Sequence, residues 1–200
     1  MGDGAIQGAK SLFCHIAPRP RNAEATRAAI LEAARERFAR ESYDDVGMRD
    51  IAGDVGVDAA LVSRYFGSKE DLFVTVLDSC SNGSELMEGD RAEFGRRVAR
   101  AVIFEPAKEG KLKGLLIMLR SVGSTKAMEL VQRTGSERFF NPFAAWVGGE
   151  DAAVRARLAS ATIMGMAVSR EITGGFGLSQ EECEKMCARM AVLLQDIIDG

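Results

Sequence analysis

The stretch VGVDAALVSRYFGSKEDLF, residues 55–73, places two chain breaks around one very short helix. Gly56 can adopt the left-handed conformation that ends a helix and reverses the chain, and Asp58 is a good N-cap for the helix that comes next. Gly67 then ends that helix. Helices this short are marginal alone in water, so neighbouring helices must hold it in place. The stretch therefore predicts a short, braced helix between two tight corners.

The segments on either side of these corners also have helical periodicity. Apolar residues recur at helical spacing over residues 23–40 and again over 48–55. Ser68 is expected to cap a fourth helix, with Asp71 three residues on in the spacing of a capping box. Residues 23–80 are therefore predicted to form four helices.

The remainder of the chain is predicted to be helical as well. No segment alternates apolar and polar residues with a period of two, so no sheet is expected. Pro142 is expected to kink or divide the helix that contains it. We therefore predict an all-α protein of about nine helices. The later helices are expected near 90–104, 110–122, 125–147, 151–173 and 179–198.

The composition is that of an ordinary water-soluble protein. Of 200 residues, 46% are hydrophobic and 28% are charged, and no uncharged run approaches the roughly 18 apolar residues of a membrane span. Residues 1–22 lack the apolar core of a secretory signal and have the texture of a flexible arm. We therefore expect a cytoplasmic protein that contacts no membrane.

Few residues are suited to catalysis or metal binding. His15 is the only histidine and lies in the N-terminal arm, which argues against a Ser–His–Asp triad and leaves a zinc site short of ligands. No glycine-rich phosphate loop is present. We expect no metal and no cofactor. Four cysteines are widely scattered and indicate no disulfide framework: Cys14, Cys80, Cys183 and Cys187. Cys183 and Cys187 are interpreted as two buried or half-buried thiols on one helix face, with a redox switch as the alternative.

Two short helices joined by a tight glycine turn describe a helix-turn-helix. A DNA major groove about 12 Å wide admits one helix, and a recognition helix enters it with its N-terminal part toward the base edges. The helix after Gly56 can be short because the two preceding helices brace it, while Tyr65 and Phe66 anchor its end. The corner therefore predicts DNA binding, with a merely structural helical hairpin as the alternative.

The segment GMRDIAGDVGVDAALVSRYFGSKEDLF, within a likeness that runs from Thr26 to Phe73, closely resembles the DNA-binding segment of TetR-family transcriptional regulators. The resemblance implies a three-helix DNA-binding domain over residues 23–82, with its helix-turn-helix at about 47–66. It also implies that residues 83–200 form a C-terminal domain for effector binding and dimerisation.

The resemblance further implies which side chains meet DNA. Arg49 is placed to reach a base or a phosphate, and Arg64 is expected to do the same from the third helix. Tyr65 and Lys69 are expected to clamp the backbone, and the N–H groups at the start of the Ser68 helix favour a phosphate. The full set is Arg49, Ala59, Ala60, Leu61, Ser63, Arg64, Tyr65, Ser68 and Lys69.

Three positions depart from the family pattern. Gly47 stands where a serine or threonine commonly caps the second helix and touches phosphate. Leu61 replaces a frequent threonine and offers only apolar contact, for example to a thymine methyl group. Ser63 replaces a frequent tyrosine. Direct base recognition is therefore expected to be sparse.

The net charge of the N-terminal part opposes DNA binding. Residues 1–82 contain 10 Lys and Arg against 13 Asp and Glu, whereas residues 83–200 contain 16 of each. DNA-binding domains are usually basic, so we expect the cations to share one face and the salt dependence to be modest. The cations are Arg19, Arg21, Arg27, Arg49, Arg64 and Lys69, with Glu32, Glu36 and Asp54 expected elsewhere.

A single helix recognises few base pairs, so a symmetric homodimer that doubles the site is expected. The last two helices are the candidate interface, because residues 157–170 carry a row of small residues and residues 183–198 carry an apolar stripe. Burial within the monomer would explain the same pattern. The candidate interface residues are Ile163, Met166, Met190, Leu194 and Ile197.

Methionine and aromatic side chains gather between the corner and this interface. Small ligands are usually held in mostly apolar pockets, and methionine adapts to varied ligands, although such stripes are also common in plain cores. The candidate effector-pocket residues are Met118, Phe139, Phe143, Trp146 and Met164.

We therefore expect a DNA-binding transcriptional regulator, a repressor released from a double-stranded DNA operator by a small apolar or amphipathic effector; activation would use the same parts. We expect no enzyme. One alternative is a helical enzyme with a buried acid among Glu105, Glu129 and Glu171. Another is a helical adaptor that uses the corner to dock a protein.

Overall fold

The computed structural model describes residues 23–80, 83–106 and 109–200, and every regular element within these ranges is helical. The predicted all-α class is confirmed. No helix in these ranges is long and apolar enough to cross a bilayer.

The α-helices are α1 (Ala23–Arg40), α2 (Met48–Val55), α3 (Ala59–Phe66), α4 (Lys69–Cys80), α5 (Gly83–Met87), α6 (Phe94–Phe104), α7 (Glu109–Ser121), α8 (Thr125–Gly135), α9 (Asn141–Val147), α10 (Ala152–Ile172) and α11 (Gln180–Asp199). A 3-10 turn, η1 (Arg91–Glu93), precedes α6, and a π-helical segment, η2 (Ser136–Phe140), joins α8 to α9.

The predicted interruption at Pro142 is confirmed, and it takes the form of a π-helical turn. Pro142 has no N–H for the carbonyl of Arg138, and its ring would clash with that carbonyl in a regular α-helix. The backbone widens instead, and the N–H of Asn141 donates to the carbonyl of Ser136, five residues back. The predicted 125–147 helix is therefore divided into α8, η2 and α9.

The N-terminal helices share their core with two helices from later in the chain. The side chains of Ile30, Phe38 and Phe73 are almost completely buried there. Helices α7 and α8 contribute Ile117, Ala127 and Leu130 to the same cluster. We call α1–α4 together with α7 and α8 the head.

The other long helices form a second core. Phe94 of α6 packs against Phe143 and Trp146 of α9, with ring centroids 5.9 and 5.3 Å away. Helix α6 also lies against α11 at Gly95, whose N–H donates to Oε1 of Gln195 at 3.0 Å. A Cβ on Gly95 would clash with the backbone of α11 at the carbonyl of Ala191. We call α6, α9, α10 and α11 the C-terminal body.

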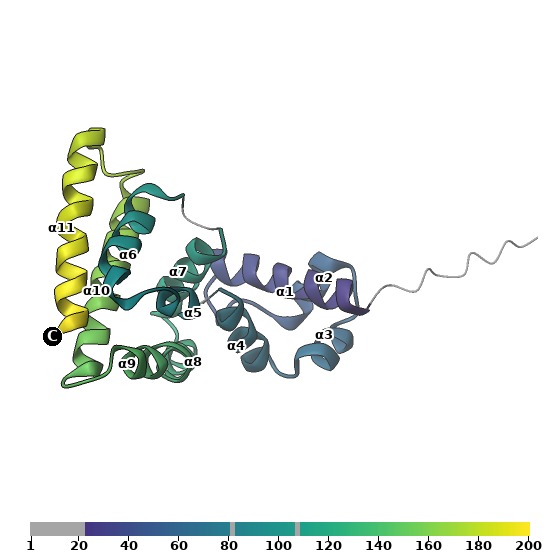
Figure 1. The fold of residues 1–200 in the computed structure, drawn as a ribbon. Helices are drawn as coiled ribbons and strands as arrows, with labels where there is room; N and C mark the ends of the chain where they lie inside the picture. The colour runs from purple at the N-terminus through teal and green to yellow at the C-terminus, as the bar shows by residue number, and fades with distance from the viewer. Residues whose placement is uncertain (1–22, 81–82, 107–108) are drawn as a thin grey trace, which may run out of the picture.

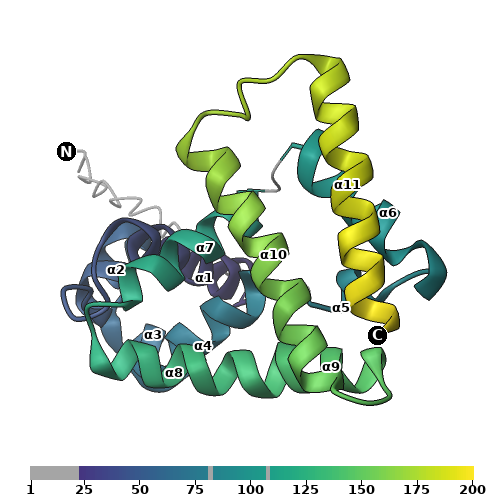
Figure 2. The ribbon, with the colours of Figure 1, turned by 90° about the vertical axis from the view of Figure 1, so that its left-hand side faces the viewer.

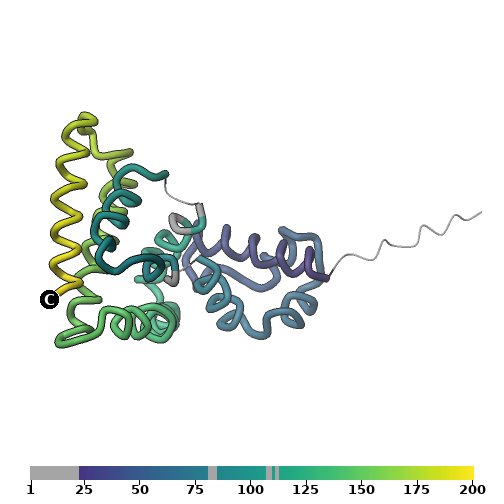
Figure 3. The backbone as a smooth tube through the Cα atoms, viewed as in Figure 1, coloured from purple at the N-terminus to yellow at the C-terminus, as the bar shows by residue number. Residues whose placement is uncertain are grey.

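The chain alternates between these two groups of helices. Figure 1 shows α1–α4 at one end of the molecule and α11 at the other, with α7 beside α1. The tube in Figure 3 follows the chain from α4 to α6 beside α11, back to α7 and α8, and then into α9–α11. After a 90° turn, α10 and α11 run along the face toward the viewer in Figure 2. The corner over residues 55–73 lies in the head, far from α11.

Candidate nucleic-acid interface

The corner between α2 and α3 has the geometry that the sequence predicts. Gly56 adopts φ 69° and ψ 40°, in the left-handed region, and the N–H of Val57 donates to the carbonyl of Ala52 at 3.0 Å. Oδ1 of Asp58 then accepts the N–H of Ala60 at 2.7 Å and caps α3. A glycine turn and a side-chain cap therefore set the direction in which α3 leaves the corner.

Helix α3 is anchored by one side and open on the other. Val62 is fully buried, and Phe66 is 7% exposed. The guanidinium of Arg27 lies 4.8 Å from the centroid of the Phe66 ring. Among the predicted DNA-binding residues of α3, Ala60, Ser63 and Arg64 are exposed, whereas Ala59, Leu61 and Tyr65 are half-buried.

The start of α4 is closed by a complete capping box. The carboxylate of Asp71 accepts the N–H of Ser68 at 3.0 Å and its hydroxyl at 2.7 Å, while that hydroxyl accepts the N–H of Asp71 at 3.1 Å. The bond from the Ser68 N–H, followed by that from its hydroxyl, holds the pKa of Asp71 below its ordinary value. The carboxylate therefore already occupies part of the helix start that we expected to favour a phosphate.

The start of α2 is capped from one side only. Oδ2 of Asp50 accepts the N–H of Gly47 at 3.0 Å, and Gly47 has no side chain to return a bond. Arg49 is exposed in the first turn of this helix. A Cβ at Gly47 would lie 2.6 Å from that Asp50 oxygen, so a serine or threonine there would displace the carboxylate.

Lys69 is held against an aromatic ring. Its Nζ lies 4.3 Å from the centroid of the Tyr43 ring, within the range of a cation–π interaction. Burial, followed by the negative charges of Glu70 and Asp44, raises the pKa of Tyr43 to about 12, so the ring stays neutral. This contact fixes the ammonium group at the first residue of α4, three residues after the end of α3.

Several carboxylates of the head are paired with cations. Asp54 binds Arg37 with both oxygens, at 2.6 and 2.9 Å, and this hydrogen bonding lowers the pKa of Asp54. Lys113 of α7 binds Glu32 at 2.9 Å and Glu36 at 2.5 Å. Helix α3 itself contains no acidic residue. The predicted cations Arg19 and Arg21, like the whole 1–22 arm, lie outside the described residues.

The predicted effector-pocket residues do not form one cluster. Phe139, Phe143 and Trp146 pack together in the core of the C-terminal body, where Phe143 is fully buried. Met118 and Met164 are not part of that core, and Met164 is 43% exposed. The pocket assignment stays a prediction.

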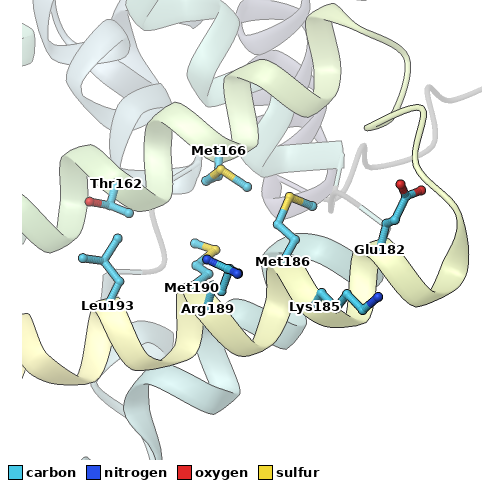
Figure 4. Close-up of a pocket in the computed structure, with 8 residues that line it drawn as sticks. All are labelled: Thr162, Met166, Glu182, Lys185, Met186, Arg189, Met190 and Leu193. Carbon is cyan, nitrogen blue, oxygen red and sulfur yellow. The ribbon is translucent and has the colours of Figure 1, made fainter.

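A groove of about 430 Å³ lies between α10 and α11 (Figure 4). None of the predicted pocket residues lines it, whereas Met166 and Met190 of the predicted interface do. Charged side chains, among them Lys185 and Arg189, lie on the α11 side of the groove. It is lined by Thr162, Met166, Glu182, Lys185, Met186, Arg189, Met190 and Leu193.

The predicted interface residues are buried or half-buried within the protomer. Leu194 is fully buried and Met190 is 5% exposed, both within the protomer. Ile163, Met166 and Ile197 are half-buried against the same core. Neighbouring apolar side chains that face outward include Val154, Leu158, Val192 and Leu193, which are 57%, 53%, 62% and 50% exposed.

The groups named for the alternative functions have ordinary surroundings. Glu105, Glu129 and Glu171 are all exposed, so none is the buried acid that the enzyme alternative needs. Cys80 is buried and Cys187 is half-buried, and burial raises the pKa of both thiols. A raised pKa disfavours the reactive thiolate. Cys14 lies outside the described residues.

Two family models match the chain on either side of the α4–α6 connection. One, described as bacterial regulatory proteins of the tetR family, matches residues 30–76, which contain the corner. The other, described as a tetracyclin repressor-like C-terminal domain, matches residues 92–198, more than half of the chain. The chain belongs to the TetR family. The predicted resemblance is confirmed.

Known TetR proteins resemble the chain in sequence and in fold. The HTH-type transcriptional repressor Rv3405c of Mycobacterium tuberculosis is 33% identical over 94 residues, or 42% of this chain and 50% of that protein, so the match spans half the length of this relative. NalD of Pseudomonas aeruginosa, the secondary repressor of the MexAB-OprM multidrug efflux pump, has a similar fold, with a TM-score of 0.65, 21% identity and coverage of 84% of this chain and 94% of that chain. A TetR-family regulator from Streptomyces coelicolor A3 has a TM-score of 0.56 and 25% identity, covering 92% and 99%.

Proposed function

We propose that this TetR protein is a sequence-specific DNA-binding transcriptional regulator. The observation that carries the proposal is the orientation of α3: Val62 and Phe66 face the core, while Ala60, Ser63 and Arg64 face solvent. No carboxylate lies on α3, and Asp54 is paired with Arg37. An exposed helix of this kind can enter a major groove and present Arg64 to a base edge or a phosphate.

The DNA proposal is tested by selecting bound fragments from random DNA and measuring affinity for the selected sequence. Arg64→Ala should weaken binding by about 5- to 150-fold for each half-site, since such a contact is worth about 1–3 kcal/mol. Arg96→Ala is the matched control, because Arg96 is an exposed arginine on α6, in the C-terminal body. Failure to enrich any sequence, or equal affinity for the two variants, would contradict the proposal.

We also propose that the protein acts as a homodimer through the outward faces of α10 and α11. Val154, Leu158, Val192 and Leu193 leave an apolar surface on two adjacent helices, and a symmetric contact would cover it on both copies. The groove in Figure 4 is continuous with this surface at Leu193. Two recognition helices would then meet half-sites about 34–36 Å apart.

The dimer is tested by sedimentation at micromolar concentration. Leu193→Glu should shift the protein toward monomer, because a charge would be buried against an apolar partner face. Leu119→Glu is the matched control, since Leu119 is 52% exposed on α7 of the head. A wild-type monomer, or equal dissociation of both variants, would rule out this interface.

We propose repression, with release by a small apolar or amphipathic effector, in the cytoplasm and without enzymatic activity. The aromatic cluster of Phe139, Phe143 and Trp146 supports an effector site among residues 85–175, and Met118 lies outside this cluster. An effector can release the operator only by its differential affinity for two conformations. A compound that raises the melting temperature should therefore also weaken operator binding, and a compound that strengthens operator binding would contradict release by an effector.

A further inference from the structure

The two packing groups of helices do not follow the order of the chain. The predicted division falls between residues 82 and 83. Packing divides the helices differently, because Ile117 of α7 and Ala127 and Leu130 of α8 are buried in the head. Among the described residues, no helix of the head makes an extensive contact with α6, α10 or α11.

Polar contacts also attach α7 and α8 to the head. Lys113 binds two carboxylates of α1, as described above, and Nε of Arg120 donates to the carbonyl of Ala39, at the end of α1, at 2.9 Å. Oγ of Ser124, the N-cap of α8, donates to Asp44 at 3.0 Å. These bonds restrict both sliding and rotation of α7 on α1.

The C-terminal body is held together in a corresponding way. Nη1 of Arg170, near the end of α10, donates to the carbonyls of Val102 and Glu105 at 2.7 Å each, and so ties α10 to the end of α6. Gly95 brings the backbones of α6 and α11 into contact. Each group of helices therefore has its own apolar core and its own polar ties.

The π-helical segment η2 lies between the two groups and contacts both. Arg138 pairs with Asp78 of α4 at 3.4 Å, on the head side. Phe139 packs on Phe143 with ring centroids 5.6 Å apart, and the guanidinium of Arg157, on α10, lies 4.2 Å from the centroid of the Phe140 ring. Three consecutive side chains thus connect α4, the helix after the recognition helix, with the dimer-face helix α10.

The backbone of η2 can change in a discrete step. A π turn holds one more residue than an α turn, and the bond between Asn141 and Ser136 marks that extra residue. Returning one residue to regular α geometry changes the rise by about 1.5 Å and rotates the subsequent helix by about 100°. Pro142 disfavours the regular geometry, so the sequence itself keeps the segment in its π form.

We propose that α1–α4, α7 and α8 move as one rigid head on the C-terminal body, and that η2 is the hinge between them. The proposal extends the proposed function, because an effector that shifts this hinge would change the spacing of two recognition helices in a dimer. The movement at η2 can be measured in the protein without DNA.

The experiment measures distances between spin labels on genetically encoded unnatural residues in the full chain, which leaves the native cysteines in place. One pair, at Lys126 of α8 and Arg96 of α6, spans the two groups; the other, at Lys126 and Asp45, lies within the head. Labelled protein is mixed with excess unlabelled protein, so that distances within one protomer are recorded. Pro142→Ala supplies the missing N–H and should shift the first distance by at least about 1.5 Å, the rise of one helical residue, while the second stays constant.

Asn141→Ala is the matched control, because it leaves the proline in place and should leave both distances unchanged. An unchanged first distance in Pro142→Ala would overturn the hinge. A shift of the distance between Lys126 and Asp45 would overturn the assignment of α8 to the head. Both readouts are independent of operator binding, so a failed DNA selection would contradict the proposed function and leave this inference standing.

Discussion

At the scale of single residues, the two ends of the recognition helix depend on glycine for different reasons. Gly56 needs only the left-handed conformation, and a Cβ there would meet no atom within 4 Å. Gly67 adopts φ 80° and ψ −126°, and a Cβ there would also lie 2.7 Å from Oδ2 of Asp71. The second position therefore combines backbone strain with a clash against the cap of α4.

We expect Gly67→Ala to lower the free energy of unfolding by about 1–3 kcal/mol, because its backbone conformation is sparsely populated by other residues. Gly53→Ala is the matched control: Gly53 lies inside α2, where an added Cβ would meet no atom within 4 Å, and alanine should stabilise that helix by about 0.5–1 kcal/mol. Urea unfolding of both variants measures the difference. Equal effects would contradict the strain at Gly67.

The cap at Asp71 also predicts a pH dependence. Its pKa is lowered in the folded state, so the stabilisation is present above the pKa of the unfolded chain and is lost as the pH falls through the folded value. Asp71→Asn keeps the shape without the charge, so it should unfold more readily at neutral pH and lose less stability in acid. Urea unfolding at several pH values between neutral and strongly acidic checks this. If the free energy of unfolding fell with pH equally in wild type and variant, this prediction would be refuted.

At the scale of elements, α3 is stable only because of its contacts with neighbouring helices. Eight residues cannot sustain a helix in water, and α3 is held by its caps and by Val62 and Phe66. Phe66 is also the ring under Arg27, which connects the end of α3 to the start of α1.

We expect Phe66→Ala to cost about 3–5 kcal/mol and to accelerate amide exchange throughout α3. Phe104→Ala, at a half-buried position on α6, is the matched control and should leave exchange in α3 unchanged after correction for global stability. Hydrogen exchange followed by mass spectrometry separates the two. Faster exchange of α3 in both variants would show that α3 is not anchored by Phe66 itself.

The element boundaries were accessible from local patterns, because caps, glycines and prolines act within a few residues. Helix orientation was harder to predict. Met190 and Leu193 are both apolar and three residues apart, yet Met190 is buried and Leu193 is half exposed, since only the position of α6 decides which side of α11 faces inward. The placement of α7 and α8 in the head depends on contacts across about 80 residues, such as that between Arg120 and Ala39, and no local signal marks them.

At the scale of the whole molecule, the chain carries a net charge of −3 and yet presents cations at the proposed interface. Asp54 and Glu36 are neutralised by Arg37 and Lys113, away from α3. A protein of this charge gains little from non-specific attraction to DNA, so specific contacts must supply more of its affinity.

We expect the logarithm of operator affinity to fall with the logarithm of salt concentration with a slope of about −5, since Arg49, Arg64 and Lys69 supply about six phosphate contacts in a dimer. Titrations between low and moderate salt, with the selected operator, measure this slope. A slope of about −9 or steeper would contradict the count and direct attention to Arg19 and Arg21. Deleting residues 1–22 would then be expected to restore the smaller value.

The contact at Gly95 carries information about other members of the family. Because the backbones of α6 and α11 touch there, any larger residue at the equivalent position would require wider spacing between these two helices. The residue found at that single position should therefore divide TetR sequences into those with close and those with separated C-terminal helices, before any of their structures is determined. Such a division would group regulators by the internal space they offer, which sequence identity alone does not reveal.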